Sequence, residues 1–257
     1  MSDARIELRV EERIAYLTIC RAEKLNAIDE DMVDALLQAC RAIERSDARV
    51  AILTGEGAKS FCAGGDIEAW SRLDAGTFSR RWLRDGHDAF DALARLTVPL
   101  IAVLNGHALG GGLELAACAD LRIAEAHVKI GLPEAGLGII PGWSGTQRAS
   151  RRFGAGLVRR MALFGEVFFA EEALALGLVD LVVTTGEGAA AAQIAAVRVL
   201  QRSARATELT KMLINAAEGE ESERVVEALA GAVAASSDDL TEGLAAYRQK
   251  RPARFGQ

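Results

Sequence analysis

The stretch VPLIAVLNGHALGGGLELAACA, residues 98–119, decides the fold of this chain. An apolar, β-rich run over residues 98–104 leads into the turn Asn105-Gly106, and three consecutive glycines then open an apolar helix that reaches Ala119. A strand, a turn and a helix in this order indicate one unit of an alternating α/β fold. The stretch also contains a glutamate, a histidine and four glycines, which make it a poor membrane span.

The alternation of strands and helices continues on both sides of this stretch. Residues 5–10 and 13–20 each alternate with period 2, which predicts an antiparallel hairpin. Apolar residues at helical spacing predict a helix over residues 29–45, with Asp29 as its N-cap. Further strands are expected at residues 50–53, 121–124 and 128–130, and helical segments at residues 67–96.

Strands that alternate with helices from residue 50 to residue 185 predict an α/β fold with a largely parallel sheet. Residues 188–247 are rich in alanine and lack a strand pattern, so we expect consecutive helices there. The sequence therefore predicts an α/β core over residues 1–185 and a helical C-terminal region over residues 186–257.

Composition places the chain among ordinary globular proteins. Its 257 residues are 50% hydrophobic and 26% charged, with a formal net charge of −6, so we expect no nucleic-acid partner. The four cysteines lie far apart, without a C-x-x-C pair or a Cys/His cluster, which predicts reduced thiols, no metal site and a cytoplasmic location. The N-terminus lacks an apolar signal core, and no membrane association is expected.

Two glycine-rich turns are expected to present unpaired backbone N–H groups. SFCAGGDI, residues 60–67, follows a strand, and its small residues would let a ligand approach the backbone closely. The alternative is a tight turn in which Asp66 caps the next helix. GHALGGGLE, residues 106–114, places three glycines at the start of a helix, where N–H donors also face outward. It lacks the G-x-G-x-x-G spacing of a dinucleotide site.

Two carboxylates accompany these turns. Glu114 falls in the first turn of the helix, where a negative charge is favourable on electrostatic grounds alone. Glu134 lies in a long apolar loop, residues 132–142, where it is either exposed or buried with a raised pKa. Two converging N–H groups can form an oxyanion hole, and two glutamates can bind a water between them and exchange protons with carbon. The pattern indicates enolate chemistry on a carbonyl compound.

These motifs resemble those of the enoyl-CoA hydratase/isomerase (crotonase) family over nearly the whole chain. The segments that carry the resemblance are RAEKLNA (21–27), FCAGGDI (61–67), NGHALGGGLEL (105–115), PE (133–134), IPG (140–142), GTQR (145–148), ALALGLVD (173–180), EGL (242–244) and KR (250–251). The resemblance implies a crotonase-like spiral of ββα units, with C-terminal helices that assemble a homotrimer or a hexamer made of two trimers.

The resemblance also implies an acyl-CoA thioester substrate, with coenzyme A as part of the substrate and no separate cofactor. The N–H groups of Ala63 and Gly111 would form the oxyanion hole. Glu114 would activate the water that adds to Cβ, and Glu134 would protonate Cα. The residues implied to bind the substrate are Lys24, Leu25, Ala27, Ala63, Gly64, Gly65, Asp66, Ile67 and Trp143, together with Tyr247 and Lys250 of a neighbouring subunit.

The sequence departs from the family pattern at Trp143 and Ser144, where small residues are common, so we expect a narrowed or reshaped acyl pocket. Residues 70–87 are expected to border this pocket. The leading hypothesis is an enoyl-CoA hydratase that adds water reversibly to a trans-2-enoyl-CoA to give a 3-hydroxyacyl-CoA. Two alternatives stay open: a Δ3-Δ2-enoyl-CoA isomerase that uses Glu134 as proton shuttle, and a non-catalytic CoA-binding paralogue.

Overall fold

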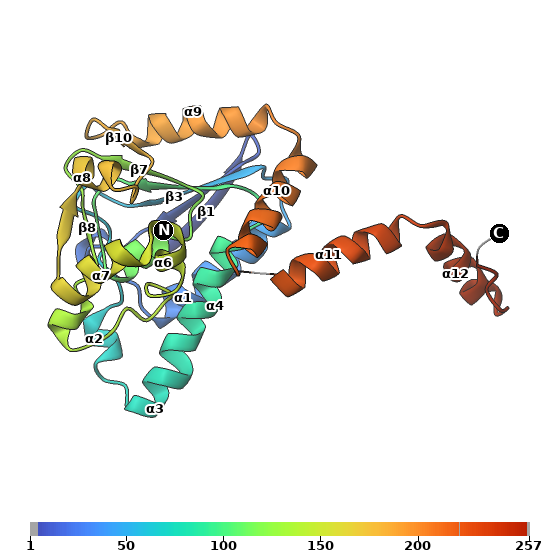
Figure 1. Cartoon of the computed structure of the whole chain (residues 1–257), viewed down its shortest axis with the longest axis horizontal. Coiled ribbons are helices and arrows are strands. Elements are labelled where there is room, and N and C mark those ends of the chain that lie inside the picture. Colours follow the sequence, from blue (N-terminus) through green and yellow to red (C-terminus); the bar gives the residue numbers. More distant parts are fainter. Residues whose placement is uncertain (1–4, 221, 256–257) are drawn as a thin grey trace. The chain divides into compact units, whose positions relative to one another are not determined.

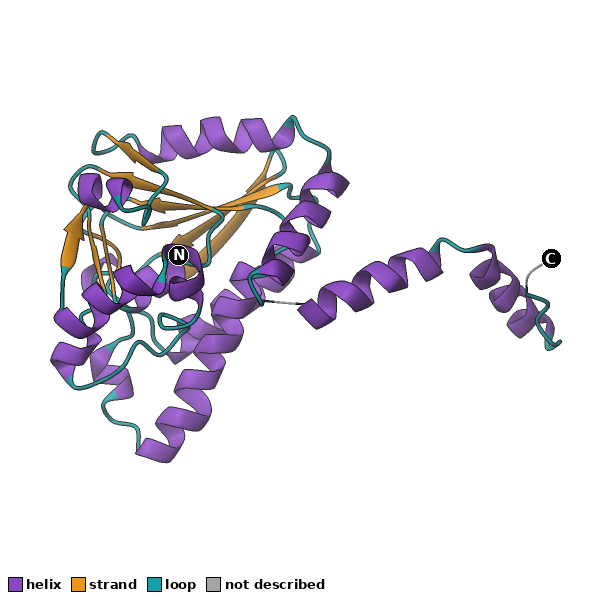
Figure 2. Ribbon diagram, viewed as in Figure 1, coloured by secondary structure: helices purple, strands orange, loops and turns teal. Residues whose placement is uncertain are grey.

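Two β-sheets form the centre of the first of two compact units (Figures 1 and 2). The computed structural model describes residues 5–220 and 222–255. The larger sheet has the strand order β1-β2-β3-β5-β7-β10, and the smaller sheet has the order β4-β6-β8-β9. The strands are β1 (Ile6–Glu11), β2 (Ile14–Ile19), β3 (Val50–Gly55), β4 (Ser60–Cys62), β5 (Leu100–Leu104), β6 (His107–Leu109), β7 (Leu121–Glu125), β8 (Lys129–Gly131), β9 (Val167–Phe169) and β10 (Leu181–Val183).

Strand pairing follows a repeated pattern. β1 and β2 pair antiparallel, with Ile6 opposite Ile19, which confirms the predicted hairpin, and every other pairing in the larger sheet is parallel. β3, β5 and β7 of the larger sheet are each followed in the chain by a strand of the smaller sheet, namely β4, β6 and β8, and these also pair in parallel. Helices complete each repeat, so the chain forms the expected spiral of ββα units.

Helices surround the two sheets. They are α1 (Glu30–Glu44), α2 (Ile67–Trp70), α3 (Ala75–Thr77), α4 (Leu83–Ala94), α5 (Gly111–Ala116), α6 (Arg148–Phe153), α7 (Ala155–Phe164), α8 (Ala170–Ala175), α9 (Gly188–Leu200), α10 (Ala204–Ala217), α11 (Ser222–Ala235) and α12 (Asp238–Gln249). Shorter turns are η1 (Ala22–Lys24) and η3 (Glu134–Leu137), both 3₁₀, and η2 (Phe78–Trp82), which is π-helical. Asp29 caps α1 as predicted, because its Oδ1 accepts the N–H of Met32.

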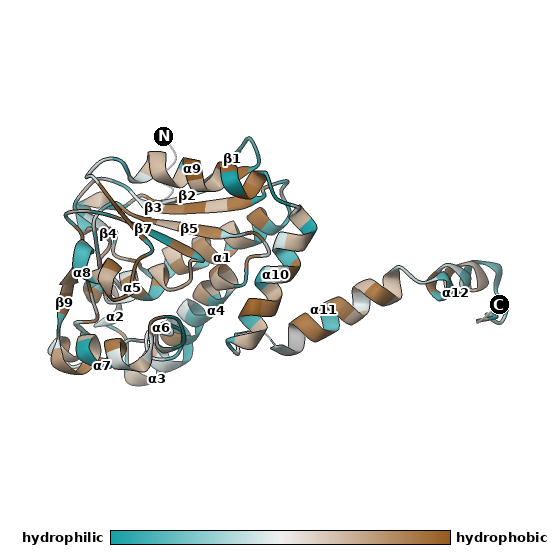
Figure 3. Cartoon of the chain, turned by 45° about the horizontal axis from the view of Figure 1, so that its top comes forward, coloured by the Kyte–Doolittle hydropathy of each residue, from teal (hydrophilic) through white to brown (hydrophobic). Residues whose placement is uncertain are grey.

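The central strands β3 and β5 of the larger sheet are buried on both faces, so their side chains alternate between two cores. Ala51 and Leu53 of β3 point into the main core, to which α1 and α4 contribute. Val50 and Ile52 point to the other face, where small alanine side chains let α9 lie close to the sheet. Figure 3 shows this hydrophobic character along β3 and β5. The first unit extends to Lys211, past the expected boundary at residue 185, because α9 covers the sheet and Lys211 of α10 pairs with Asp120.

Some elements differ from the sequence prediction. Residues 107–109 belong to an expected turn but form β6, and β4 lies in an expected loop. Both strands have three residues, too few to show a period of 2, and they form because parallel partners lie beside them. The predicted run of C-terminal helices is confirmed by α9 to α12. Among the described residues, no helix is long and apolar enough to cross a membrane.

The side chain of Asn26 connects the turn between β2 and α1 to the loop between β3 and β4 through hydrogen bonds. Its side chain is fully buried, and its φ of 57° lies in the left-handed region. Its Oδ1 accepts the N–H of Arg21 at 3.0 Å, and its Nδ2 donates to the carbonyl oxygens of Glu56 at 3.0 Å and Ser60 at 2.7 Å. This side chain therefore connects the turn to both ends of the loop between β3 and β4.

We expect Asn26→Ala to lower the free energy of unfolding by about 2–4 kcal/mol, because it leaves buried backbone groups without a partner. Urea unfolding followed by circular dichroism measures the loss. Glu23→Ala, at an exposed position of the same turn, is the control and should change stability by no more than about 0.5 kcal/mol. Equal unfolding midpoints for the two variants would contradict this role of Asn26.

Candidate active site

The candidate site lies at the carboxyl ends of three neighbouring parallel strands, β4, β6 and β8. The loops that follow these strands enclose a cavity of ≈ 90 Å³. Its lining includes Gly65, Ile67, Trp82, Gly111, Glu114, Glu134 and Trp143. The parallel pairing explains why loops far apart in the sequence meet here, since the ends of parallel strands share one edge of a sheet.

Glycines allow the loops after β4 and β6 to touch through their backbones. A Cβ atom on Gly64 would lie 3.0 Å from the nitrogen of Gly111, and a Cβ atom on Gly111 would lie 3.1 Å from the Cα atom of Gly64. At Gly112 a Cβ atom would lie 1.9 Å from the carbonyl oxygen of Cys62, which no side chain can tolerate. Glycine is thus required at these positions by the close approach of two chain segments.

The structure offers a different pair of free amides from the pair that the family resemblance implies. The N–H of Ala63 donates to the carbonyl oxygen of Leu25 at 3.1 Å and is therefore already used. The N–H groups of Gly65 and Gly111 donate no hydrogen bond to any atom of the described residues, and both glycines line the cavity. The donors available to a ligand are thus those of Gly65 and Gly111.

Glu114 is held in a defined orientation beneath the cavity. Its side chain is 3% exposed, and its Oε1 accepts the N–H groups of Trp143 at 2.7 Å and Gly145 at 2.6 Å. Burial raises the pKa of Glu114 to about 7, the charge of Glu134 adds to this rise, and the amide hydrogen bonds oppose it. A Cβ atom on Gly145 would lie 2.7 Å from Oε1, so this glycine lets the loop close over the carboxylate.

Glu134 enters the cavity from the first residue of η3. Both of its carboxyl oxygens are buried and have no hydrogen-bond partner within the described part of the chain. Burial raises the pKa of Glu134 to about 7. A Cβ atom on Gly110 would lie 2.9 Å from its Oε1, which places the carboxyl group directly beside the glycine turn after β6. Of the two alternatives left open by the sequence, the structure therefore supports a buried carboxyl group with a raised pKa.

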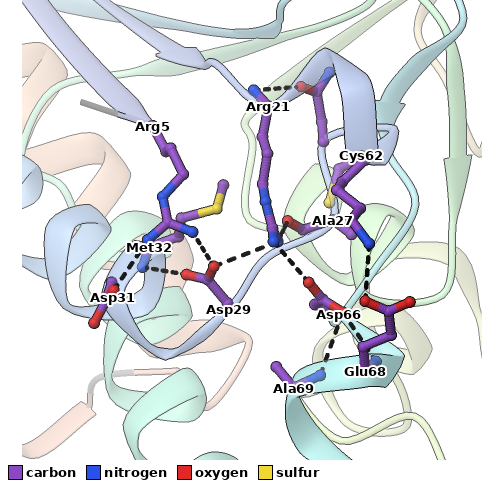
Figure 4. A network of polar contacts seen from close by, with 12 residues as sticks. Arg5, Arg21, Ala27, Asp29, Asp31, Met32, Cys62, Asp66, Glu68 and Ala69 are labelled. Carbon is purple, nitrogen blue, oxygen red and sulfur yellow. Dashed lines mark hydrogen bonds and ion pairs between the residues drawn. The ribbon is translucent and has the colours of Figure 1, made fainter. Parts of the chain in front are cut away.

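An ionic network supports the loop that carries Gly65 (Figure 4). The Nη2 atom of Arg21 lies 2.8 Å from Oδ2 of Asp66, and its Nη1 atom lies 3.4 Å from Oδ2 of Asp29. Asp66 also caps α2 by accepting the N–H groups of Glu68 and Ala69, as predicted. Burial alone would raise the pKa of Asp66, but Arg21 and these amides lower it below its usual value. The pairing of Arg21 with Asp66 was not predicted from the sequence.

The other residues implied to bind the substrate occupy several settings. Gly64, Gly65 and Ile67 line the cavity, and Ile67 is 50% exposed at its opening. Lys24 is exposed and pairs with Glu68, with 2.9 Å between Nζ and Oε2. Leu25 is exposed, and the carbonyl oxygen of Ala27 accepts a hydrogen bond from Arg21. Tyr247 and Lys250 are exposed residues of the second unit.

Aromatic side chains form one end of the cavity. Trp143 lines it, as expected, and so do Trp70, Phe78 and Trp82 from the segment expected to border the acyl pocket. Sequence reasoning did not single out these three residues individually. Phe78 and Trp82 are four residues apart in a helical segment, so both lie on one face of it. This spacing is the sequence signal that could have identified them as residues lining the pocket.

The residues described here contain no group of three or more His, Cys, Asp or Glu side chains arranged to hold a metal ion. All four cysteines are free thiols. Burial raises the pKa of Cys62 and of Cys40 to about 12, which leaves both thiols protonated near neutral pH.

Comparison with known families gives a match to the model described as "Enoyl-CoA hydratase/isomerase" over residues 9–257. The chain belongs to this family. It is 37% identical over 258 residues to a crotonyl-CoA hydratase of Syntrophomonas wolfei, with 99% of each chain covered. It is 38% identical over 209 residues to a short-chain-enoyl-CoA hydratase of Clostridium acetobutylicum, covering 81% of this chain and 80% of that one.

Solved structures share the fold of this chain. The structure of Pseudomonas aeruginosa DspI is 33% identical, covers 100% of this chain and 98% of that chain, and superposes with a TM-score of 0.81. These similarities confirm the family and the spiral fold that the sequence motifs indicated. The two glycine turns and the two glutamates singled out by the sequence analysis contribute residues to the lining of the cavity described above.

The raised pKa of Glu134 predicts a pH-dependent cost to stability. The folded protein keeps this proton at pH values where the unfolded chain has released it, so the stabilisation is present below about pH 4.5 and lost as the pH rises through about 7. Glu134→Gln should therefore raise the free energy of unfolding at about pH 8 by about 1–2 kcal/mol. Partial exposure of this residue to solvent makes the effect smaller than the full pKa difference would give.

Thermal unfolding at a series of pH values measures this effect. The difference between the variant and the parent protein should vanish at about pH 4. Glu23→Gln, at an exposed position, is the control and should follow the parent curve throughout. Parallel curves for Glu134→Gln and the parent protein would show that this carboxyl group is not buried with a raised pKa.

Proposed function

We propose that this protein is an enoyl-CoA hydratase that adds water reversibly to a trans-2-enoyl-CoA thioester and forms a 3-hydroxyacyl-CoA. The observation that carries the proposal is the pair of buried carboxyl groups, Glu114 and Glu134, on one cavity with two free glycine amides. A protein that only binds CoA esters gains nothing from burying two ionisable groups beside the ligand, since such burial costs free energy.

The amides supply the oxyanion hole. In the proposed complex the thioester oxygen accepts the N–H groups of Gly65 and Gly111, and these bonds strengthen as the enolate charge develops on that oxygen. Both donors are fixed before the substrate arrives, because the backbones at Gly64 and Gly111 are in contact. The stabilisation therefore requires little reorganisation during the reaction.

The two carboxyl groups then divide the proton transfers. Burial raises both pKa values to about 7, and the charge of Glu134 adds to the rise for Glu114, so one group can be charged while the other is protonated at neutral pH. Glu114 has Oε1 occupied by two amides, which leaves Oε2 to take a proton from water as the water oxygen bonds to Cβ. The π electrons move to form the enolate, and protonated Glu134 delivers its proton to Cα.

The experiment that tests this proposal mixes the purified protein with crotonyl-CoA. We expect loss of the enoyl-thioester absorbance and formation of 3-hydroxybutyryl-CoA, identified by mass. Glu114→Gln and Glu134→Gln should each lower kcat by about 10²–10⁴-fold. Glutamine at position 114 keeps an Oε1 acceptor for the two amides, so the loop should stay in place. Glu12→Gln, an exposed variant, should keep full activity.

The same variants distinguish hydration from isomerisation. In a Δ3-Δ2-enoyl-CoA isomerase Glu134 alone would shuttle the proton, so Glu114→Gln would keep its activity on a 3-enoyl-CoA. The two amide bonds to Glu114 favour hydration, because they orient this carboxylate toward a second reactant. Full turnover by Glu114→Gln would replace the hydratase proposal with the isomerase.

Assembly and the CoA end of the site belong to the same proposal. α11 and α12 expose large apolar side chains, including Val226, Val233 and Leu244, as a surface that packs against other copies would. We infer a homotrimer or a pair of trimers, in which Tyr247 and Lys250 of one copy reach the nucleotide end of CoA bound to another. A cationic Lys250 suits the 3′-phosphate of CoA.

Lys250→Glu should raise KM for crotonyl-CoA about 10-fold with little change in kcat, because it removes a charge-assisted bond to phosphate. The KM for the dephospho-CoA ester, which lacks that phosphate, should change much less. Arg248→Glu, at another exposed position near the end of α12, is the matched control. Parallel changes with both esters would exclude the contact between Lys250 and the 3′-phosphate.

A further inference from the structure

The indole ring of Trp143 lies against both glycines that carry the free amides. Its Cε3 and Cζ3 atoms are 3.2 and 3.3 Å from the point where a Cβ atom on Gly111 would stand. Its Cη2 atom is 3.5 Å from the corresponding point on Gly65. An acyl chain whose carbonyl oxygen binds the two amides must therefore extend along this ring.

The ring is fixed from behind. Its Nε1 donates to the carbonyl oxygen of Trp82 at 3.2 Å, and the whole residue is 3% exposed. The ring centroids of Trp82 and Phe90 lie 4.9 and 5.0 Å from that of Trp143. A Cβ atom on Gly86 would lie 2.0 Å from Nε1, so α4 accommodates the indole only because this residue is glycine. The ring cannot withdraw into the core without displacing α4.

Other residues that line the cavity are exposed. Ile67, Leu137 and Ile140 line it and are 50%, 59% and 66% exposed. Because these side chains are exposed, packing confines them less than the buried aromatic side chains, and we expect them to limit an acyl chain less. The limit comes from the buried aromatic end, where Trp143 and Trp82 meet.

The space in front of this end is small. The cavity measures ≈ 90 Å³, whereas an apolar cavity of about 150 Å³ is known to bind benzene. This volume includes the part of the cavity lined by the exposed residues, so the space in front of the aromatic end is smaller still and suits a short acyl chain. We infer that Trp143 is the residue that sets acyl-chain length, forming a fixed wall that restricts the site to short acyl groups. The inference rests on the proposed function for the position of the carbonyl group.

Trp143→Ala tests the wall, because it removes the indole and keeps the backbone N–H that binds Glu114. kcat/KM is measured for trans-2-enoyl-CoA esters of increasing length, from the four-carbon to the ten-carbon ester. In the parent protein the eight-carbon ester should react at least about 100-fold less efficiently than the four-carbon ester. Trp143→Ala should reduce this ratio by about 10-fold or more, chiefly by raising activity on the long ester.

Two further variants keep the result interpretable. Trp143→Phe retains an aromatic ring and loses the hydrogen bond to Trp82, so its ratio of kcat/KM for the short and long esters should be intermediate. This variant replaces Trp143→Ala in the test if Trp143→Ala does not fold. Phe153→Leu changes a buried aromatic residue of α6 outside the cavity and should leave the ratio unchanged. Equal efficiency of the parent protein on both esters, or an unchanged ratio in folded Trp143 variants, would overturn the inference.

A binding measurement separates this inference from the proposed function. Saturated butyryl-CoA and octanoyl-CoA cannot be hydrated, and calorimetry compares their affinities in the parent protein and in Trp143→Ala. Preference for butyryl-CoA that disappears in the variant supports the wall, even if no enoyl-CoA is hydrated and the proposed reaction fails. If the protein hydrates enoyl-CoA but binds both saturated esters equally, the proposed reaction is supported and the proposed role of Trp143 is wrong.

Discussion

The backbone contact between the ends of β4 and β6 is the constraint on which the site depends. Parallel pairing brings these ends together, and the absence of a side chain at Gly64 and Gly111 lets them touch. The same contact leaves the amides of Gly65 and Gly111 without partners beside the cavity. Because β4 and β6 are paired strands of the ββα spiral, the fold keeps these donors fixed, which an oxyanion hole requires.

Burial of the carboxyl groups of Glu114 and Glu134 lowers the stability of the folded protein near neutral pH. Both pKa values rise to about 7, so the site is least favourable to folding where both groups are charged. The amides of Trp143 and Gly145 stabilise the charge of Glu114, whereas both carboxyl oxygens of Glu134 have no hydrogen-bond partner among the described residues. This asymmetry suits a pair in which one group accepts a proton and the other donates it.

The sequence predicted the elements whose signal is local. The hairpin, the helix capped by Asp29 and the two glutamates follow from period, capping residue and loop composition. It could not show which amide of the loop after β4 stays free, because that depends on the bond from Ala63 to Leu25 across 38 positions of sequence. Trp82 was missed for a similar reason, since its contact with Trp143 joins two segments that only the fold brings together.

Trp143 connects chemistry and specificity through separate parts of one residue. Its backbone N–H holds Glu114, a bond that any residue except proline can donate, whereas its indole closes the acyl cavity. A side chain at this position can therefore change without loss of the amide that orients the carboxylate. The loop after Pro141 thus allows substrate range to vary while the proton-transfer geometry is kept, provided that the facing position on α4 has room for the new side chain, as Gly86 has for the indole.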